Sequence, residues 1–400
     1  MSDSGTVELA YERRGPAGAT PIVFLGSLGS DRAMWLPQVS GLSADHDTVA
    51  VDLRGHGESP VPTGPYTVSQ LAGDVAALLG RLGIESAHVV GLSLGGAVAQ
   101  QLAIDHPGPV RSLTLLCTSA RFGEPAGWTD RAAAVRADGT GSIAAAVVGR
   151  WFTAALAHRD PPLVERMREM VTGTPDEGYA ACCEALAVFD SRADLGRITV
   201  PTLVIGAIED PATPPEHQRL LADGIVGARL RVLDHAAHLA SYEQAGAVTA
   251  AIREHVDGAE QRSVAYATGM RNRRSVLGDT HVDRAVAKTT PLTAIFQDFI
   301  TRTAWGDVWE RPGLDHETRR LLTIAILTAV GNEHELDMHI RAALRAGMDA
   351  DRIAEVLLHT AVYAGVPNSN RGFAMTAAAV ADLAAQAALD AQTAAAQATG

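Results

Sequence analysis

The pentapeptide Gly91-Leu92-Ser93-Leu94-Gly95 constrains the fold of this chain more than any other segment. A short apolar run at 87–90 precedes it and is typical of a buried strand, whereas the small and apolar residues at 96–103 are typical of a helix. A Gly-x-Ser-x-Gly segment between a strand and a helix forms a sharp, strained turn that exposes the serine hydroxyl. Glycine tolerates such a tight backbone. We therefore predict that Ser93 is a nucleophile on a strand–turn–helix element.

Composition bounds the class of protein. A chain of 400 residues is long enough for two or three domains, and 47% hydrophobic residues argue against disorder. The formal net charge of −13 disfavours nucleic acid or an anionic membrane as a partner. Cys117, Cys182 and Cys183 are too few for a disulfide framework. We see no signal peptide and no apolar run of membrane-spanning length, so we expect a cytoplasmic protein with no membrane partner.

The chain divides into two regions of different pattern. Over residues 1–257, helical stretches alternate with short apolar runs, as in a mostly parallel sheet covered by helices; the runs lie at 22–25, 48–51, 87–90, 112–116, 202–205 and 230–233. Residues from about 120 to 197 interrupt this alternation and are predicted to form a helical cap. After a linker at 258–263, residues 264–400 show helical apolar spacing and end in an alanine-rich tail. The predicted fold class is α/β with a helical cap, followed by an all-α domain.

A serine nucleophile needs a base, and the base needs an orienting acid. On a strand–turn–helix scaffold of this kind, the acid and then the histidine follow the serine along the chain. Glu209 and Asp210 come after the apolar run at 202–205, and His235 and His238 come after the run at 230–233. We predict Asp210 as the acid and His238 as the base, with Glu209 and His235 as the alternatives.

An oxyanion that forms on the substrate needs two backbone N–H donors. Leu94, directly after the nucleophile, is predicted to supply one of them. Leu28 is predicted to supply the other, because its loop follows the strand at 22–25. His56 lies in a segment after another strand, and we interpret that segment as bracing loops beneath the site.

The all-helical region contains Glu333-His334-Glu335-Leu336-Asp337-Met338-His339. A helical zinc motif places two histidines four residues apart. His334 and His339 are five apart and diverge by about 140° on a helix, so no metal site is predicted. Glu335 and His339 are four apart and share a face. An acid–base pair would use that spacing, and a surface ion pair would fit it equally well.

Residues 5–257 resemble an α/β-hydrolase, and 3-oxoadipate enol-lactonases are the most similar subgroup. The resemblance is carried by segments 26–31, 34–35 and 209–215. It implies acyl transfer to water through Ser93, Asp210 and His238. The cap must then bind the side-chain carboxylate of the lactone, and the candidates that the sequence leaves open are Arg121, Arg131, Arg136 and Arg150.

Residues from about 264 to 385 resemble the 4-carboxymuconolactone decarboxylase family, through segments 274–282, 296–302, 304–309, 318–325 and 359–368. The wider superfamily includes alkylhydroperoxidase D-like reductases, which depend on a Cys-x-x-Cys pair before the histidine. This region contains no cysteine. Glu335 falls where a redox cysteine would be, and His339 keeps the histidine position, so thiol-based peroxidase chemistry is excluded.

The same resemblance implies the roles of the residues in the second site. His339 or His281 would donate the proton, and Glu335 would orient or relay it. Arg274 and Arg319 would bind substrate carboxylates through bidentate contacts. No cofactor is implied, because the lactone ring can itself accept the electrons of the departing carboxylate.

Together the resemblances imply a bifunctional enzyme of the protocatechuate branch of the 3-oxoadipate pathway. Decarboxylation of 4-carboxymuconolactone would yield the enol-lactone that the hydrolase opens. Carboxylated lactones are thus the expected small-molecule partners, and assembly into a homo-oligomer through the C-terminal domain is expected. One alternative is a general esterase whose C-terminal domain serves only as an oligomerisation module. Another is direct attack of water on the lactone, with Ser93 acting as a donor.

Overall fold

The structure is a computed structural model that describes residues 5–398, and at Pro291 and 395–398 it describes the backbone alone. The chain divides into two compact units, Met1–Ala259 and Glu260–Gly400. Each unit has its own apolar cores, so each is described by itself.

The first unit is built on a sheet whose strand order is β1-β3-β2-β4-β5-β6-β7. β1 pairs with β3 in antiparallel fashion, and the other neighbours are parallel. The strands are β1 (Tyr11–Arg14), β2 (Ile22–Leu25), β3 (Thr48–Val51), β4 (Ala87–Leu92), β5 (Val110–Leu116), β6 (Thr202–Ala207) and β7 (Arg229–Leu233). Every predicted apolar run coincides with one of the strands β2 to β7, and the predicted α/β class is confirmed.

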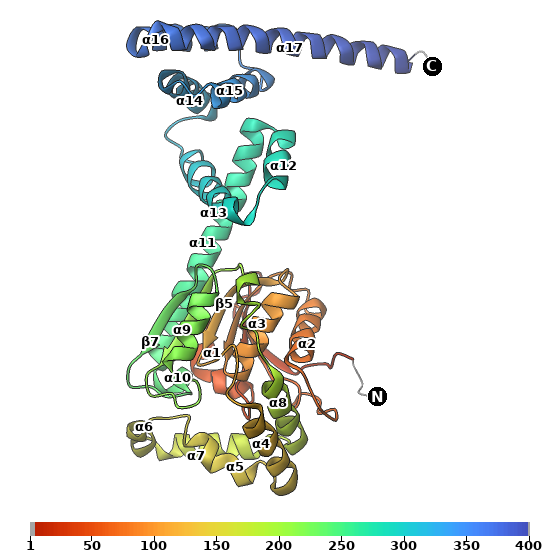
Figure 1. The fold of residues 1–400 in the computed structure, drawn as a ribbon, viewed down its shortest axis with the longest axis vertical. Coiled ribbons are helices and arrows are strands. Elements are labelled where there is room, and N and C mark those ends of the chain that lie inside the picture. Colours follow the sequence, from red (N-terminus) through yellow and green to blue (C-terminus); the bar gives the residue numbers. More distant parts are fainter. Residues whose placement is uncertain (1–4, 399–400) are drawn as a thin grey trace. The chain divides into compact units, whose positions relative to one another are not determined.

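Helices cover both faces of this sheet (Figure 1), since parallel strands are apolar on both sides. Along β2, Val23 and Leu25 belong to one core and Ile22 and Phe24 to the other, as the two-residue period of a strand requires. The first core includes residues of α2 (Val68–Arg81), α3 (Leu94–Asp105) and α9 (Pro215–Gly224). The second includes residues of α1 (Leu36–Leu42), α10 (Ala240–Glu243) and α11 (Ala245–Leu277).

A cap of helices is inserted between β5 and β6. It consists of α4 (Pro125–Asp138), α5 (Gly141–Val148), α6 (Ala154–Arg159), α7 (Pro161–Thr172) and α8 (Asp176–Val188), and α4 to α7 gather at one end of the unit (Figure 1). α8 lies directly on the loop after β3, because a Cβ atom on Gly178 would come within 2.1 Å of the Gly55 carbonyl oxygen. The cap is therefore in backbone contact with the sheet's loops.

The predicted linker at 258–263 is not a break in secondary structure. These residues lie inside α11, which begins in the first unit and ends in the second. Gly258 and its polar neighbours resemble a loop in sequence. A glycine inside a helix costs only about 1 kcal/mol, however, and Val256 and Ala259 are buried on the same helix.

The second unit is built from helices in its described residues. They are the end of α11, α12 (Asp279–Ala287), α13 (Pro291–Ile300), a π-helical stretch at Thr301–Val308, α14 (His316–Val330), α15 (Glu333–Arg345), α16 (Ala350–Ala364) and α17 (Val366–Ala398). One small core contains Ile324, Ile340 and Leu357. Another contains Trp305 and Trp309, whose ring centroids are 4.9 Å apart.

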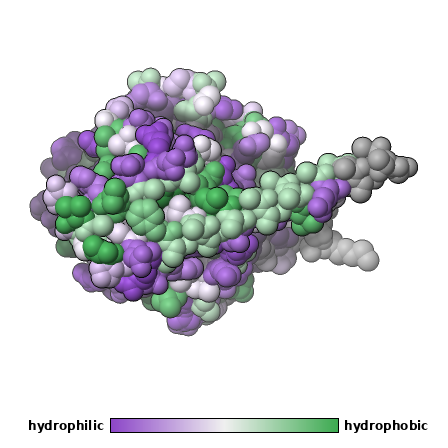
Figure 2. Space-filling model, turned by 90° about the horizontal axis from the view of Figure 1, so that it is seen from above, coloured by the Kyte–Doolittle hydropathy of each residue, from purple (hydrophilic) through white to green (hydrophobic). Residues whose placement is uncertain are grey.

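One helix is long and apolar enough to cross a membrane. Residues Val366–Ala394 of α17 have a mean hydropathy of 1.4, so the expectation that no segment reaches this length and composition is wrong. The helix crosses the face seen in Figure 2 as a pale green band, the colour of weakly apolar residues. A single such helix is a weak signal, and Asp382 on α17 forms an ion pair with Arg341 of α15 at 2.8 Å. It does not make the chain a membrane protein.

Candidate active sites

Ser93 lies at the turn between β4 and α3 and has a left-handed backbone with φ of 56°. The flanking glycines are required by close backbone contacts. A Cβ atom on Gly91 would lie 2.2 Å from the Gly95 carbonyl oxygen, and one on Gly95 would lie 2.1 Å from the Leu25 carbonyl oxygen. The strained turn directs a serine out of the carboxyl end of a central strand, as the sequence pattern predicts.

Replacing Gly95 with alanine is expected to destabilise the first unit by about 3 kcal/mol or more and to abolish any hydrolysis that depends on Ser93, because backbone must move to admit the methyl group. Thermal unfolding and a hydrolysis assay would check this. Gly73→Ala is the matched control: Gly73 lies inside α2 with nothing within 4 Å of its added Cβ atom, so that change should leave stability equal or higher. Equal effects of the two substitutions would contradict the close-contact account.

Asp210 and His238 meet beside this turn. Nδ1 of His238 lies 2.9 Å from Oδ2 of Asp210. The hydroxyl of Thr213 donates to the same carboxylate at 2.7 Å. Burial raises the pKa of the Asp210 carboxyl, but the charge and hydrogen bond of His238 and the bonds from Thr213 outweigh burial and hold that pKa below its usual value. Asp210 therefore stays ionised and can orient the imidazole.

The two alternatives lie apart from this pair. His235 has a side chain that is 91% exposed, and it lies 4.0 Å from the half-exposed Glu209. Asp210 and His238, by contrast, are only 2% and 3% exposed. The structure thus brings one histidine and one acid together near Ser93 and leaves the other two as a surface pair.

Leu28 and Leu94 provide backbone N–H groups near Ser93. Among the residues that the structure describes, neither N–H donates to a protein acceptor. The Gly95 N–H donates to the Gly26 carbonyl at 2.9 Å and so ties the turn to the loop that carries Leu28. The Leu28 and Leu94 N–H groups are therefore available as donors to an oxyanion that forms on the substrate.

His56 braces the loop of Leu28 from below. The Gly29 N–H donates to Nε2 of His56 at 3.0 Å, and Nδ1 lies 3.2 Å from the Arg54 carbonyl. Burial lowers the pKa of His56, which keeps the imidazole neutral and Nε2 available as an acceptor. The interpretation of this segment as a brace is confirmed.

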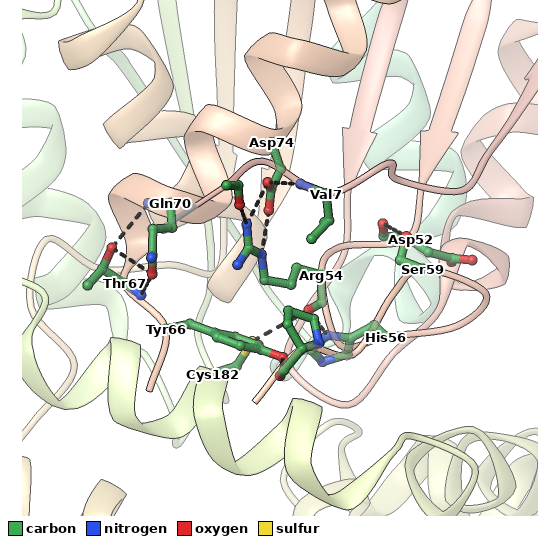
Figure 3. Close-up of polar contacts among 12 residues, drawn as sticks. Val7, Asp52, Arg54, His56, Ser59, Tyr66, Thr67, Gln70, Asp74 and Cys182 are labelled. Atoms are coloured by element: carbon green, nitrogen blue, oxygen red, sulfur yellow. Dashed lines mark hydrogen bonds and ion pairs between the residues drawn. The ribbon is translucent and has the colours of Figure 1, made fainter. Parts of the chain in front are cut away.

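Arg54 anchors the same segment to its surroundings, as Figure 3 shows. Its guanidinium donates to both carboxylate oxygens of Asp74 on α2, each at 2.8 Å, and stacks 5.4 Å from the centre of the Tyr66 ring. The thiol of Cys182, on the cap helix α8, lies 3.8 Å from the Arg54 carbonyl oxygen. The brace beneath the oxyanion loop is therefore fixed to both α2 and the cap.

A small cavity of about 50 Å³ lies between Ser93 and the cap. Leu28, Ser93 and His238 line it from the sheet, and Arg131 and Arg150 line it from the cap. Burial lowers the pKa of Arg150, and the like charge of Arg131 lowers it further. No described carboxylate forms an ion pair with either arginine, so two unneutralised cations face the nucleophile.

The other two cap arginines are bound elsewhere. Arg136 forms ion pairs with Glu177 at 2.8 Å and with Glu184 at 2.5 Å. Arg121 lies 3.5 Å from Glu124. Neither lines the cavity. Of the four candidates, Arg131 and Arg150 are therefore the two that line the cavity.

In the second unit, His281 of α12 lies close enough to Glu335 and His339 of α15 for their charges to interact. Burial is the largest cause of a lowered pKa at His281, followed by the positive charge of Arg273, whereas the charge of Glu335 opposes them. His339 is 8% exposed, whereas His334 is exposed and lines the same groove as His281. Within residues 5–398, no three His, Cys, Asp or Glu side chains gather as a possible metal site.

The burial of His339 predicts a pH-dependent stability. Burial, followed by the charges of Arg320 and His281, lowers the pKa of His339 to about 4. An unfolded histidine titrates near 6.5, so this stabilisation is complete above that pH and is lost as the pH falls toward 4, by on the order of 3 kcal/mol.

Urea unfolding at several pH values should show that the free energy of unfolding depends less steeply on pH in His339→Gln than in the parent chain. Identical slopes would contradict a buried, neutral imidazole. Because both proteins keep His255, whose pKa burial also lowers to about 4, the comparison isolates His339.

The structure does not bring Arg274 and Arg319 to this cluster. Arg274 forms ion pairs with Asp279 at 2.8 Å and Asp283 at 2.6 Å on the surface. Arg319 donates to the Arg311 carbonyl at 2.8 Å. The residues next to them in sequence, Arg273 and Arg320, carry the buried guanidinium groups. Arg273 is 5% exposed and Arg320 is 8% exposed.

Arg273 and Arg320 differ in how they are satisfied. Arg320 donates to the carbonyls of Val276 and Ser275 at 2.9 and 3.1 Å and so caps the end of α11. Arg273 donates to the Gln297 side chain at 2.9 Å, but its buried Nε has no acceptor. The charge of Glu335 acts on Arg273, but no described carboxylate forms an ion pair with this buried guanidinium, which therefore suits an anionic ligand. The sequence signal for Arg273 is the helical phase, because it shares the buried face of α11 with Val276 and Leu277.

The fold and these residues define two classes of enzyme domain. A serine at a strand-to-helix turn, with an aspartate and a histidine after later parallel strands, defines an α/β-hydrolase with an inserted cap. A model of the alpha/beta hydrolase fold matches residues 20–245, and a model of the carboxymuconolactone decarboxylase family matches residues 295–378. The chain belongs to both families, as a fusion of one member of each.

Individual relatives agree with this division. The chain is 38% identical to 3-oxoadipate enol-lactonase 2 of Acinetobacter baylyi over 246 residues, which are 62% of this chain and 92% of that protein. It is 45% identical to 4-carboxymuconolactone decarboxylase of the same organism over 124 residues, which are 31% of this chain and 90% of that protein. The crystal structure of an enol-lactonase from Burkholderia xenovorans LB400 is 40% identical with a TM-score of 0.61, covering 63% of this chain and 97% of that one.

Proposed function

We propose that this chain catalyses two consecutive reactions of the protocatechuate branch of the 3-oxoadipate pathway. The second unit converts 4-carboxymuconolactone to 3-oxoadipate enol-lactone and CO₂, and the first unit hydrolyses that lactone to 3-oxoadipate. The observation that carries the proposal is the pairing itself: one relative is named as the decarboxylase of a carboxylated lactone, and the other is named as an enol-lactonase. Three free, buried cysteines fit the reducing cytoplasm as the site of action.

Lactone opening follows from the geometry around Ser93. His238 takes the serine proton while Ser93 attacks the lactone carbonyl, and the Leu28 and Leu94 N–H groups stabilise the oxyanion. The ring C–O bond then breaks, and His238 returns the proton to the leaving enolate oxygen. The enol that results tautomerises to the ketone, as the O–H proton is lost and a proton is added to the neighbouring carbon. Water attacks the acyl-Ser93 ester with His238 again as the base. Asp210 holds the imidazole in the required tautomer throughout.

Arg150 and Arg131 suit the side-chain carboxylate of this lactone. Replacing Arg150 with glutamine is expected to raise KM for the enol-lactone about tenfold with a smaller change in kcat, because a charge-assisted contact made equally in substrate and transition state is lost. Steady-state hydrolysis rates would measure it. Arg136→Gln is the matched control, since Glu177 and Glu184 already bind that guanidinium. An unchanged KM in Arg150→Gln would remove Arg150 from the binding site.

Decarboxylation needs no group beyond the side chains of the second site. The C–CO₂ bond breaks, and its electron pair moves through the ring double bond to the lactone carbonyl oxygen, giving a dienolate. A proton must then reach the ring carbon next to that carbonyl. We assign this donation to His281, which lines an open groove, whereas His339 is buried behind it. Glu335 orients or relays the proton, and Arg273 replaces Arg274 as a ligand for a substrate carboxylate.

Assembly through the second unit is part of the proposal. Several large apolar side chains on its helices are exposed in a single chain: Leu292 (88%), Ile295 (70%), Phe296 (59%), Phe299 (54%), Val362 (76%) and Tyr363 (79%). Exposed apolar faces of this extent are typical of subunit interfaces. Sedimentation should give a mass that is a multiple of 41.8 kDa, and Phe296→Glu should lower it. A parent chain that sediments as one copy would contradict this assignment.

The test of the proposed function is to supply each lactone separately to the purified chain. We expect CO₂ from 4-carboxymuconolactone and 3-oxoadipate from the enol-lactone. A general esterase with a helical assembly module would hydrolyse simple esters and the enol-lactone but would release no CO₂. Direct attack of water would leave Ser93 unmodified by a phosphonate probe, whereas the proposed route gives a covalent adduct on the Ser93 peptide in mass spectrometry.

A further inference from the structure

A groove runs between α12 and α15 in the second unit. Its volume is about 590 Å³, far larger than the cavity at Ser93. His281 and Arg284 of α12 and Lys288, directly after that helix, line one side, and Arg341 and Arg345 of α15 line the other. The groove is therefore rich in cations, although the whole chain carries a net charge of −13.

The acids in the groove are already neutralised. Asp337 lies 2.9 Å from Arg341, and Asp279 lies 2.8 Å from Arg274. These are the acidic side chains that line it. Arg284, Lys288 and Arg345 form no ion pair with any carboxylate that the structure describes. Three positive charges thus face a hollow instead of a protein anion.

His281 connects this groove to the buried cluster behind it. Its imidazole lines the groove, and burial and Arg273 are the main causes of its lowered pKa, with Arg284 and Arg345 also lowering it. Both groove guanidinium groups are therefore close enough to act on the ring. A carboxylate bound between them would lie beside the proton donor assigned above.

We propose that this groove binds a carboxylate of the decarboxylase substrate, the one that stays in the product, through Arg284 and Arg345. Lys288 adds attraction for the anion. Arg273 lies inside the cluster and holds the substrate's other carboxylate. A solvated cationic surface would also explain unpaired arginines, but it would not explain why they converge on a hollow lined by His281. The inference rests on the proposed decarboxylation and adds the residues that select a dicarboxylate.

The test uses the full chain and two readouts. The first is the affinity for tricarballylate, an unreactive tricarboxylate, by isothermal titration. The second is KM for 4-carboxymuconolactone. Arg284→Gln and Arg345→Gln should each weaken both about tenfold and leave enol-lactone hydrolysis, a reaction of the first unit, unchanged. An unchanged thermal unfolding of the second unit would report that it is still folded. Arg341→Gln is the control, because it removes the same charge from the same groove but Asp337 and Asp382 already bind that guanidinium.

The outcomes separate this inference from the proposed function. If tricarballylate does not bind, or if Arg341→Gln weakens binding as much as Arg284→Gln does, the groove is not the carboxylate site. If CO₂ is released with an unchanged KM in both variants, the inference fails and the decarboxylation stands. If tricarballylate binds through Arg284 and Arg345 but no CO₂ is released, the anion site stands and the proposed decarboxylation fails.

Discussion

Replacing Ser93 with alanine is expected to lower enol-lactone hydrolysis by about 10⁴-fold or more, because the nucleophile and the proton that His238 accepts are both lost. The small cavity at Ser93 should still form, since the hydroxyl is not needed to hold the turn: the Ser93 N–H donates to Leu116 and its carbonyl accepts from Ala97 and from Thr118. CO₂ release from 4-carboxymuconolactone should remain at the parent rate. Coupled assays of both products in one preparation would measure the two effects.

Two results would contradict this expectation. Loss of CO₂ release along with hydrolysis, in a folded Ser93→Ala chain, would mean that one site performs both reactions. Hydrolysis that falls less than about tenfold would favour direct attack of water, with Ser93 as a donor. Phosphonate labelling of the parent chain would then distinguish a spectator serine from an acylated one.

Replacing His281 with alanine is expected to lower decarboxylation by about 10²- to 10⁴-fold, the usual contribution of a general acid. Enol-lactone hydrolysis should not change, because His281 belongs to the second unit. His339→Gln should have a smaller effect on the rate, since that imidazole is buried and does not line the groove. Single-turnover CO₂ release would compare the two variants directly.

The comparison of the two variants identifies the proton donor, because the larger loss of CO₂ release is expected for the histidine that donates the proton. If His339→Gln abolished CO₂ release and His281→Ala left it near the parent rate, the proton donor would be His339, and the groove would not be the reacting site. The free energy of unfolding of His339→Gln at a pH above about 7, where the parent imidazole is neutral, would serve as the control, because it reports whether the variant keeps its packed surroundings.

β2 to β7 lie at the expected places. β2 to β6 were predictable because they are buried along nearly their whole length and leave apolar runs, whereas β7 is exposed over its first three residues and was predictable only from Leu230, Val232 and Leu233. β1 was not predicted, because its residues Tyr11-Glu12-Arg13-Arg14 form a polar edge strand with no apolar period. The continuous helix α11 was missed for a related reason. Its polar stretch around Gly258 looks like a loop in sequence, but Val256 belongs to the second core of the sheet unit and Ala259 is also buried.

The candidate residues show where sequence reasoning ends. Adjacent acids Glu209 and Asp210 both follow β6, and only the fold shows that one is buried against His238 while the other faces solvent. Arg273 and Arg274 are likewise neighbours, and the phase of α11 buries the first and exposes the second. Among the cap arginines, Arg131 and Arg150 could be distinguished from Arg136 only by the lining of the cavity and by the ion pair of Arg136 with Glu177. These contacts join residues far apart in the sequence, so no local sequence pattern predicts them.

The most direct test of two consecutive reactions on one chain is to supply 4-carboxymuconolactone alone and to measure both products over time. The account predicts CO₂ and 3-oxoadipate in equal amounts from the parent chain, and CO₂ with accumulating enol-lactone from Ser93→Ala. Absence of CO₂ from the parent chain, or enol-lactone that accumulates in the parent chain without being opened, would contradict it.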